Sequence, residues 1–229
     1  QRRANELLPS QRQICYVVLP QLSTRHNGLV IALRQRTAIA SGWSKPKALK
    51  LTDDLLNSLG DPTDRELCAL IVGGSWVNEN LTADAYRFDR SHATFRIPPG
   101  AGRTLLKHMI DTGRCLVDLS EDGSEGLETP VRWGGDSPWG LWLAGAWSEE
   151  GAALELTLEL RRGGEEKLSI GRPELVLGGP DGLVLHGGEA APLDDREALR
   201  WISQFRESLG TDDDVKPRHV PKEDIERFL

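Results

Sequence analysis

The chain of 229 residues is long enough to bury a core without disulfides. The first 52 residues carry nine basic side chains and one acid, a net charge of +8, whereas residues 53–229 carry 19 bases and 34 acids, a net charge of −15. Such asymmetry points to an interaction surface more than to a particular fold. No apolar stretch approaches the ~18 residues of a membrane span and no signal-peptide pattern is present, so we expect a cytoplasmic protein.

The cysteines and histidines do not form a metal-binding pattern. Cys15, Cys68 and Cys115 lack CxxC spacing and lie in apolar runs, so we predict core residues in a reducing compartment. The five histidines are scattered, without i,i+4 pairs or neighbouring cysteines, so we predict no metal site. The chain begins at Gln1 without a methionine, and we expect it to be a segment of a longer protein.

Short apolar runs in the first 50 residues predict strands. Residues 14–19 form a run rich in β-branched side chains that ends before Pro20. A second run covers residues 29–40 after the turn-like residues 26–28, which predicts a hairpin with the first run. The glycine and proline of residues 42–46 then interrupt the pattern.

Capping residues predict helices along the rest of the chain. Thr63 and Glu66 fit a capping box, in which each side chain accepts from the backbone amide of the other residue. The predicted helices are a short one over residues 52–59, one from Thr63 to the stop at Gly73, one over residues 105–110 that Gly113 ends, one from Asp194 to Gly210, and a terminal one that begins at Pro221.

The second half of the chain has the pattern of an antiparallel meander. Residues 154–160 alternate strictly between leucine and a polar residue, which is typical of a strand with one buried face. Residues 141–147, 175–177 and 183–185 are further strand candidates separated by glycine-rich turns. We therefore predict an α+β fold, mainly antiparallel sheet with peripheral capped helices, divided into residues 1–130 and 131–229 or forming one compact domain.

The sequence contains partial matches to catalytic motifs, but each lacks residues that the motif requires. Residues 99–104 look like the end of a phosphate-binding loop, but Ile97 stands where the first glycine is needed and Arg103 where the lysine is needed. The serines flanked by glycine lack the GxSxG frame, and paired glutamates lie beside turns. We expect the chain to be non-catalytic.

Four of the seven tryptophans, Trp133, Trp139, Trp142 and Trp147, fall within fifteen residues. Exposed on a sheet, they would form a stacking platform for sugars or bases. Buried, they would fill the core, which is the preferred interpretation because tryptophan is highly buried on average.

Residues 27–52 contain no acid, and they carry the candidate binding site. Arginine and lysine in such a segment can contact a phosphate backbone or an acidic protein face. Alternatively, the acidic remainder of the chain neutralises them, and the charge distribution by itself favours this second interpretation. The candidate contact residues are Arg34, Arg36, Lys45, Lys47 and Lys50, with Trp43 as the anchor.

Several segments together resemble one protein family. They are Gly42-Trp43-Ser44-Lys45-Pro46, residues 59–67, Phe95 with residues 105–106 and 112–114, and, near the end, residues 181–185, Trp201-Ile202 and Val220-Pro221. This combination resembles the region before the motor of bacterial SWI/SNF-like ATPases. These are superfamily-two, DEAD/DEAH-box-related proteins, often with a SWIM zinc finger upstream.

The resemblance implies that the parent is an ATP-dependent translocase or helicase acting on double-stranded DNA. This chain would be its accessory domain, docking on the ATPase lobes of the same polypeptide or on DNA, in the cytoplasm or with the nucleoid. The parent's motor would bind ATP and Mg²⁺, and this region would bind no cofactor. Two alternatives stay open: a regulatory protein-interaction module without nucleic-acid contact, and a glycan-binding β domain that uses the tryptophans.

Overall fold

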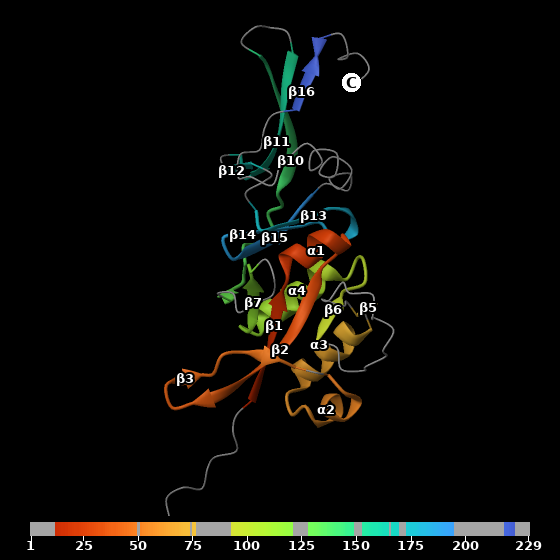
Figure 1. Ribbon diagram of the computed structural model, residues 1–229, viewed down its shortest axis with the longest axis vertical. Helices are drawn as coiled ribbons and strands as arrows, with labels where there is room; N and C mark the ends of the chain where they lie inside the picture. The colour runs from red at the N-terminus through yellow and green to blue at the C-terminus, as the bar shows by residue number, and fades with distance from the viewer. Residues whose placement is uncertain are drawn as a thin grey trace, which may run out of the picture. The chain divides into compact units, whose positions relative to one another are not determined.

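The computed structural model of the protein describes residues 12–49, 51–73, 75–76, 93–120, 128–148, 153–164, 166–169, 173–194 and 218–222 (Figure 1). The chain divides into two compact units, Gln1–Val131 and Arg132–Leu229. Helices α1 to α4 lie in the first unit, and strands occur in both, so the predicted α+β class is confirmed.

The first unit is built on one sheet. Its strands follow the order β5-β6-β2-β1-β7-β8, and the short β3 and β4 also pair with β2. The strands are β1 (Arg12–Val18), β2 (Val30–Ile39), β3 (Gly42–Trp43), β4 (Lys47–Ala48), β5 (Ser75–Trp76), β6 (Thr94–Arg96), β7 (Cys115–Asp118) and β8 (Glu128–Pro130). The helices are α1 (Pro20–His26), α2 (Asp53–Ser58), α3 (Pro62–Val72) and α4 (Gly102–Asp111).

The central strand β1 has an antiparallel neighbour and a parallel one. β1 pairs antiparallel with β2, as predicted, and Tyr16 lies opposite Leu33. β7 runs parallel to β1, with Tyr16 opposite Cys115, so the sheet is mixed rather than purely antiparallel. Parallel neighbours require a long crossover connection, and the chain between β2 and β7, which includes α3 and α4, provides one.

Helix α1 occupies the connection between β1 and β2, where the sequence predicted only a turn. Pro20 takes the first helical position, at which its missing N–H has no intrahelical partner to lose. Asn27 ends the helix in the left-handed region, with φ of 49°. The Ser23 hydroxyl donates to the Leu19 carbonyl and accepts from the Val30 amide, which ties the helix to the start of β2.

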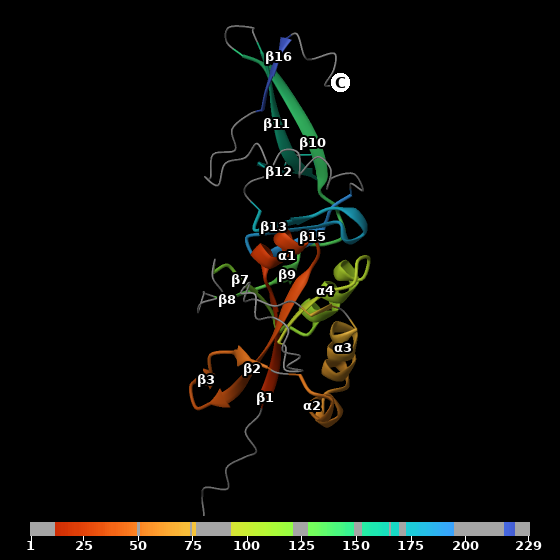
Figure 2. The ribbon, with the colours of Figure 1, turned by 45° about the vertical axis from the view of Figure 1, so that its right-hand side comes forward.

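The sheet of the first unit is covered on both faces. Cys15 and Val17 point to the face where Leu22 of α1 packs. Tyr16 points to the opposite face and bonds Asp64 of α3, because successive side chains of a strand alternate. Figure 2 shows α3 and α4 on that side of β1 and β2. The three cysteines are buried free thiols, as predicted, and burial raises the pKa of Cys115 to about 12.

Helix α3 starts before the predicted capping box. Asp61 is the N-cap, and its carboxylate accepts from the Thr63 amide at 2.9 Å. Pro62 takes the first helical position, which its fixed φ favours, so Thr63 lies inside the helix and is not its cap. The cap of α2 is Thr52, whose hydroxyl accepts from the Leu55 amide.

The second unit contains two four-stranded sheets. One has the order β10-β11-β12, with β16 also on β11, and the other has the order β13-β14-β15-β9. The elements are β9 (Arg132–Trp133), β10 (Gly140–Trp147), β11 (Ala153–Arg162), β12 (Glu166–Ser169), β13 (Leu175–Leu177), the 3₁₀ helix η1 (Gly179–Asp181), β14 (Leu183–His186), β15 (Glu189–Pro192) and β16 (Arg218–Pro221).

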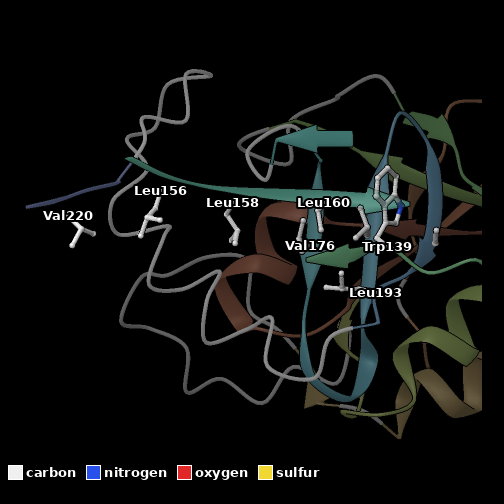
Figure 3. Packing of buried hydrophobic residues seen from close by; sticks show 9 residues of the cluster. Trp139, Leu156, Leu158, Leu160, Val176, Leu193 and Val220 are labelled. Carbon is white, nitrogen blue, oxygen red and sulfur yellow. The ribbon is translucent and has the colours of Figure 1, made fainter. Parts of the chain in front are cut away.

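The alternating leucines of β11 form the core of the second unit, as their period of two predicted. Leu156, Leu158 and Leu160 are buried on one face of the strand (Figure 3). Val176 and Leu193 belong to the same cluster, so side chains from both sheets contribute to one core.

The terminal helix predicted from Pro221 is contradicted at its first residue. Pro221 lies in β16, opposite Ala153 of β11. Proline is tolerated in an edge strand where its nitrogen lies on the side without a partner strand, because no inter-strand hydrogen bond is then lost. The predicted helix from Asp194 to Gly210 and the candidate residue Lys50 lie outside the described residues, Asp194 itself excepted.

Candidate interface on the outer end of β2

β2 runs from the core of the first unit into solvent, and its outer end carries the predicted site. Residues 30–33 are buried, and residues 38–39 are exposed. β3 and β4 pair with this outer half and place Trp43 opposite Ala38 and Lys47 opposite Gln35. We call residues 35–48 the arm. In Figures 1 and 2, β3 extends from β2 away from α2 and α3.

The turn at the tip of the arm is held by a glycine and a serine. Gly42 has φ of 128°, a value that side chains other than glycine rarely allow. Ser44 then bonds Thr37 twice, because its amide donates to the Thr37 carbonyl and its hydroxyl accepts from the Thr37 amide. These bonds fix the return of the chain along β2.

Arg34 is held inside the first unit rather than offered to a partner. Its guanidinium donates to Asp118 at 2.7 Å and to Glu128, and its side chain is 17% exposed. Burial by itself raises the pKa of Asp118, but hydrogen bonds from Ser120 and the charge of Arg34 outweigh it and lower that pKa. For Arg34 the intramolecular interpretation of the basic segment is therefore correct.

The half-buried Arg36 and the exposed Trp43 form a cation–π pair. The Arg36 guanidinium lies 5.0 Å from the centre of the Trp43 ring, and its Nε donates to Gln13 at 2.8 Å. Trp43 is 41% exposed. Because Trp43 lies opposite Ala38, it shares a face with Arg36, two residues along the strand. This pair offers a flat aromatic surface and a positive charge together.

The other face of the arm is also basic. Lys47, opposite Gln35, shares this face with Ile39, which is 50% exposed. Arg12 lies opposite Thr37 on β1 and adds a second exposed charge there. Sequence reasoning did not select Arg12, although an antiparallel hairpin places the start of its first strand beside the end of the second. Lys45, after β3, is also exposed.

The tryptophans of the second unit do not form one platform. Of Trp139, Trp142 and Trp147, only Trp139 is buried, so the prediction that the tryptophans fill the core is correct for that residue and wrong for the other two. Trp139 is 3% exposed, whereas Trp142 and Trp147 are 53% and 55% exposed. Trp142 lies opposite Glu159, and Trp147 lies opposite Leu154 on the leucine face. An odd separation along a strand places side chains on opposite faces, so these two rings cannot bind one sugar together.

A second polar cluster is buried under α3. The Tyr16 hydroxyl donates to Asp64 at 2.5 Å, and Arg114 donates to the other carboxylate oxygen at 2.7 Å. Burial and the bond to Asp64 raise the pKa of Tyr16, and burial with the Asp64 charge raises that of Cys68 to about 12. The cluster joins residues from β1, α3 and the residue before β7, and its buried groups are paired with one another.

Comparisons with protein-family models, with curated proteins and with solved structures found no match. Within the described ranges, no helix is long and apolar enough to cross a membrane. The same residues contain no group of three or more His, Cys, Asp or Glu side chains arranged to hold a metal ion.

Proposed function

We propose that this chain is a non-catalytic accessory domain of a bacterial SWI/SNF-like, ATP-dependent DNA translocase, and that it contacts double-stranded DNA through the arm. The family part of the proposal rests on the sequence resemblance, and part of that resemblance, residues 42–46, lies in the arm. The observation that carries the DNA part is the Arg36–Trp43 pair, in which the half-buried guanidinium stacks on an exposed ring.

The arm has the chemistry of a phosphate-backbone contact. Arg36, Lys45 and Lys47 are within twelve residues that contain no acid, and Arg12 lies beside them on β1. Basic side chains on DNA release counterions, which gives affinity that does not depend on base sequence and that weakens with salt. Stacking on Trp43 restricts the Arg36 side chain, so less conformational entropy is lost on binding.

The charge of the whole chain limits the affinity that the arm can provide. The net charge is −7, and Arg34 is already neutralised by Asp118 and Glu128. We therefore expect weak binding by the isolated chain, and a contribution to DNA affinity chiefly where a motor holds the duplex nearby and raises its effective concentration.

The test is fluorescence anisotropy of a labelled DNA duplex with the isolated chain at about 50 mM and about 150 mM salt. The variant Arg36→Ala/Lys47→Ala should reduce the slope of log affinity against log salt by about two. The matched control is Arg25→Ala/Arg103→Ala, which removes the same charge from exposed positions outside the arm and should bind more tightly than the arm variant.

Two results would contradict the DNA contact. One is the absence of any salt-sensitive binding by the unmodified chain. The other is equal weakening in the arm variant and in its control, which would mean that only net charge matters.

A second candidate partner is the ATPase part of the parent protein. The observation that favours it is the exposure of Ile39 and Trp43 at the tip of the arm, because apolar side chains are used at protein interfaces. In this case Ile39→Ser/Trp43→Ala in the full-length parent should change the ATP hydrolysis rate and leave DNA affinity unchanged.

A further inference from the structure

The edge strand β10 is long, apolar and exposed. Its eight residues are Gly-Leu-Trp-Leu-Ala-Gly-Ala-Trp, with no charged side chain and no proline. Trp142, Leu143 and Trp147 are exposed, although large apolar side chains on a sheet are normally covered. This strand therefore has the composition of a core element and the position of a surface element.

One side of β10 has no partner strand in the described part of the chain. β11 pairs with its whole length on the other side, and no described strand pairs with the open side. Sheet edges carry unpaired N–H and C=O groups, and proteins usually protect them with charges or proline. The other edge of the same sheet has such protection, from Lys167 in β12 and Pro221 in β16. β10 has none.

We propose that β10 pairs antiparallel with β10 of a second copy of this chain, with Ala144 opposite Ala144 at the two-fold axis. The sheet that contains β10 and β11 then joins the same sheet of the second copy, and the two form one continuous sheet. The inference is independent of the DNA contact, because β10 belongs to the second unit and the arm to the first.

Side-chain size selects a second copy as the partner. In this register the exposed Leu143 faces Gly145 of the second copy, and Trp142 faces Ala146, so these two bulky side chains meet small ones. The exposed Trp147 faces Leu141, which makes an apolar pair. The absence of charge on the strand means that two identical strands do not repel each other, as like charges placed opposite do.

The two faces of the sheet and the existing bonds of Trp139 restrict the register. A two-fold axis perpendicular to the sheet places the leucine faces of both copies on the same side. Residues that lie opposite each other then have side chains on the same face, so their numbers must be both even or both odd. Centring on Leu143 instead would bring Trp147 of the second copy opposite Trp139. The Trp139 backbone is already bonded to Pro192 and Asp194, so that register is blocked. Centring on Ala144 avoids it.

The size of the contact predicts a weak dimer. Eight residues of strand span about 27 Å. One added strand pair gives an interface at the small end of the range, below about 1,200 Å² in total. We therefore expect a dissociation constant in the micromolar range, which sedimentation velocity can measure between about 1 µM and about 200 µM.

The decisive experiment uses opposite charges at the axis. Ala144→Lys and Ala144→Glu should each be monomeric up to the highest concentration, because each places like charges opposite one another. An equimolar mixture of the two should form a heterodimer. The control Thr157→Lys adds a charge on the same face of β11, opposite Ala144. In the dimer its two copies lie about 14 Å apart, beyond the screening length of about 8 Å, so it should still dimerise.

A cross-linking experiment tests the register without depending on charge. Under oxidised glutathione, Ala144→Cys should form a disulfide dimer. Ala146→Cys should not, because the two copies of residue 146 are about 14 Å apart in this register, and bridged Cα atoms lie within about 7 Å. The native cysteines Cys15, Cys68 and Cys115 are buried and leave the readout clear.

The proposal is overturned if the unmodified chain stays monomeric over the whole concentration range. It is equally overturned if the lysine and glutamate variants fail to associate when mixed, or if Ala146→Cys cross-links as efficiently as Ala144→Cys. Loss of folding in a charged variant, detected by circular dichroism, leaves the cysteine pair as the deciding comparison.

Discussion

Arg34 and Arg36 lie two residues apart on the same face of β2, yet they have opposite surroundings. Arg34 is at the end of the buried half of the strand, where Asp118 and Glu128 bind it. Arg36 is two residues further out, where it is half-buried and stacks on Trp43. Chemically identical side chains therefore have acidic partners at one position and an aromatic partner two residues further along.

This comparison shows why a charged segment cannot be interpreted as a unit. Partial burial makes an unpaired charge costly, so Arg34 at the inner position is paired with acidic side chains from other strands. Solvent screens the outer position, where an ion pair would contribute little. Substitutions should therefore affect stability strongly in the buried region and binding mainly in the arm.

The largest effect is expected in the buried cluster under α3. Asp64→Ala leaves the Arg114 guanidinium and the Tyr16 hydroxyl without their buried partner, which should reduce the free energy of unfolding by about 3–5 kcal/mol. Denaturant unfolding measures this. Asp61→Ala is the comparison: Asp61 is about half exposed and caps α3, so we expect a loss of about 1 kcal/mol.

Arg34→Ala should cost less than Asp64→Ala and more than any substitution in the outer arm. It leaves the buried Asp118 carboxylate without its guanidinium, and we expect a loss of about 2 kcal/mol. Arg36→Ala, two residues away, should change the free energy of unfolding by less than about 1 kcal/mol. Equal losses in the two variants would contradict the distinction between the two halves of β2.

The Asp118 site should also make stability depend on pH. Since the pKa of Asp118 is lower in the folded protein than the ordinary 3.8, its contribution is present above that pH and is lost as pH falls through the folded-state pKa. Asp118→Asn should be less stable at neutral pH and lose less on acidification. Unfolding midpoints measured from pH 7 to about pH 3 would show the difference.

The smallest change in stability is expected for Trp43→Ala. The ring is partly exposed and loses mainly its cation–π contact, worth about 0.5–1 kcal/mol. Its effect on DNA or partner binding should be larger than its effect on unfolding. A variant that binds normally would remove Trp43 from the interface.

Much of the fold follows from local pattern. The apolar run of β1 and the alternating leucines of β11 predicted their strands because the period of two is a property of the backbone. Thr52 caps α2 and Gly113 follows α4, as residues with these conformational preferences predict. The predicted capping box at Thr63 was wrong because Pro62, one residue earlier, sets the first helical position.

The sequence by itself determined which residues are charged, which strands alternate and that the cysteines are core residues, because these depend on side-chain chemistry and short spacings. Tertiary structure decided that Arg34 pairs with Asp118 and Glu128, which are 84 and 94 residues away. It also decided that β7 joins β1 in parallel and that β10 pairs with β11 alone among the described strands. Such pairings depend on which distant segments the fold brings together, and no local pattern specifies them.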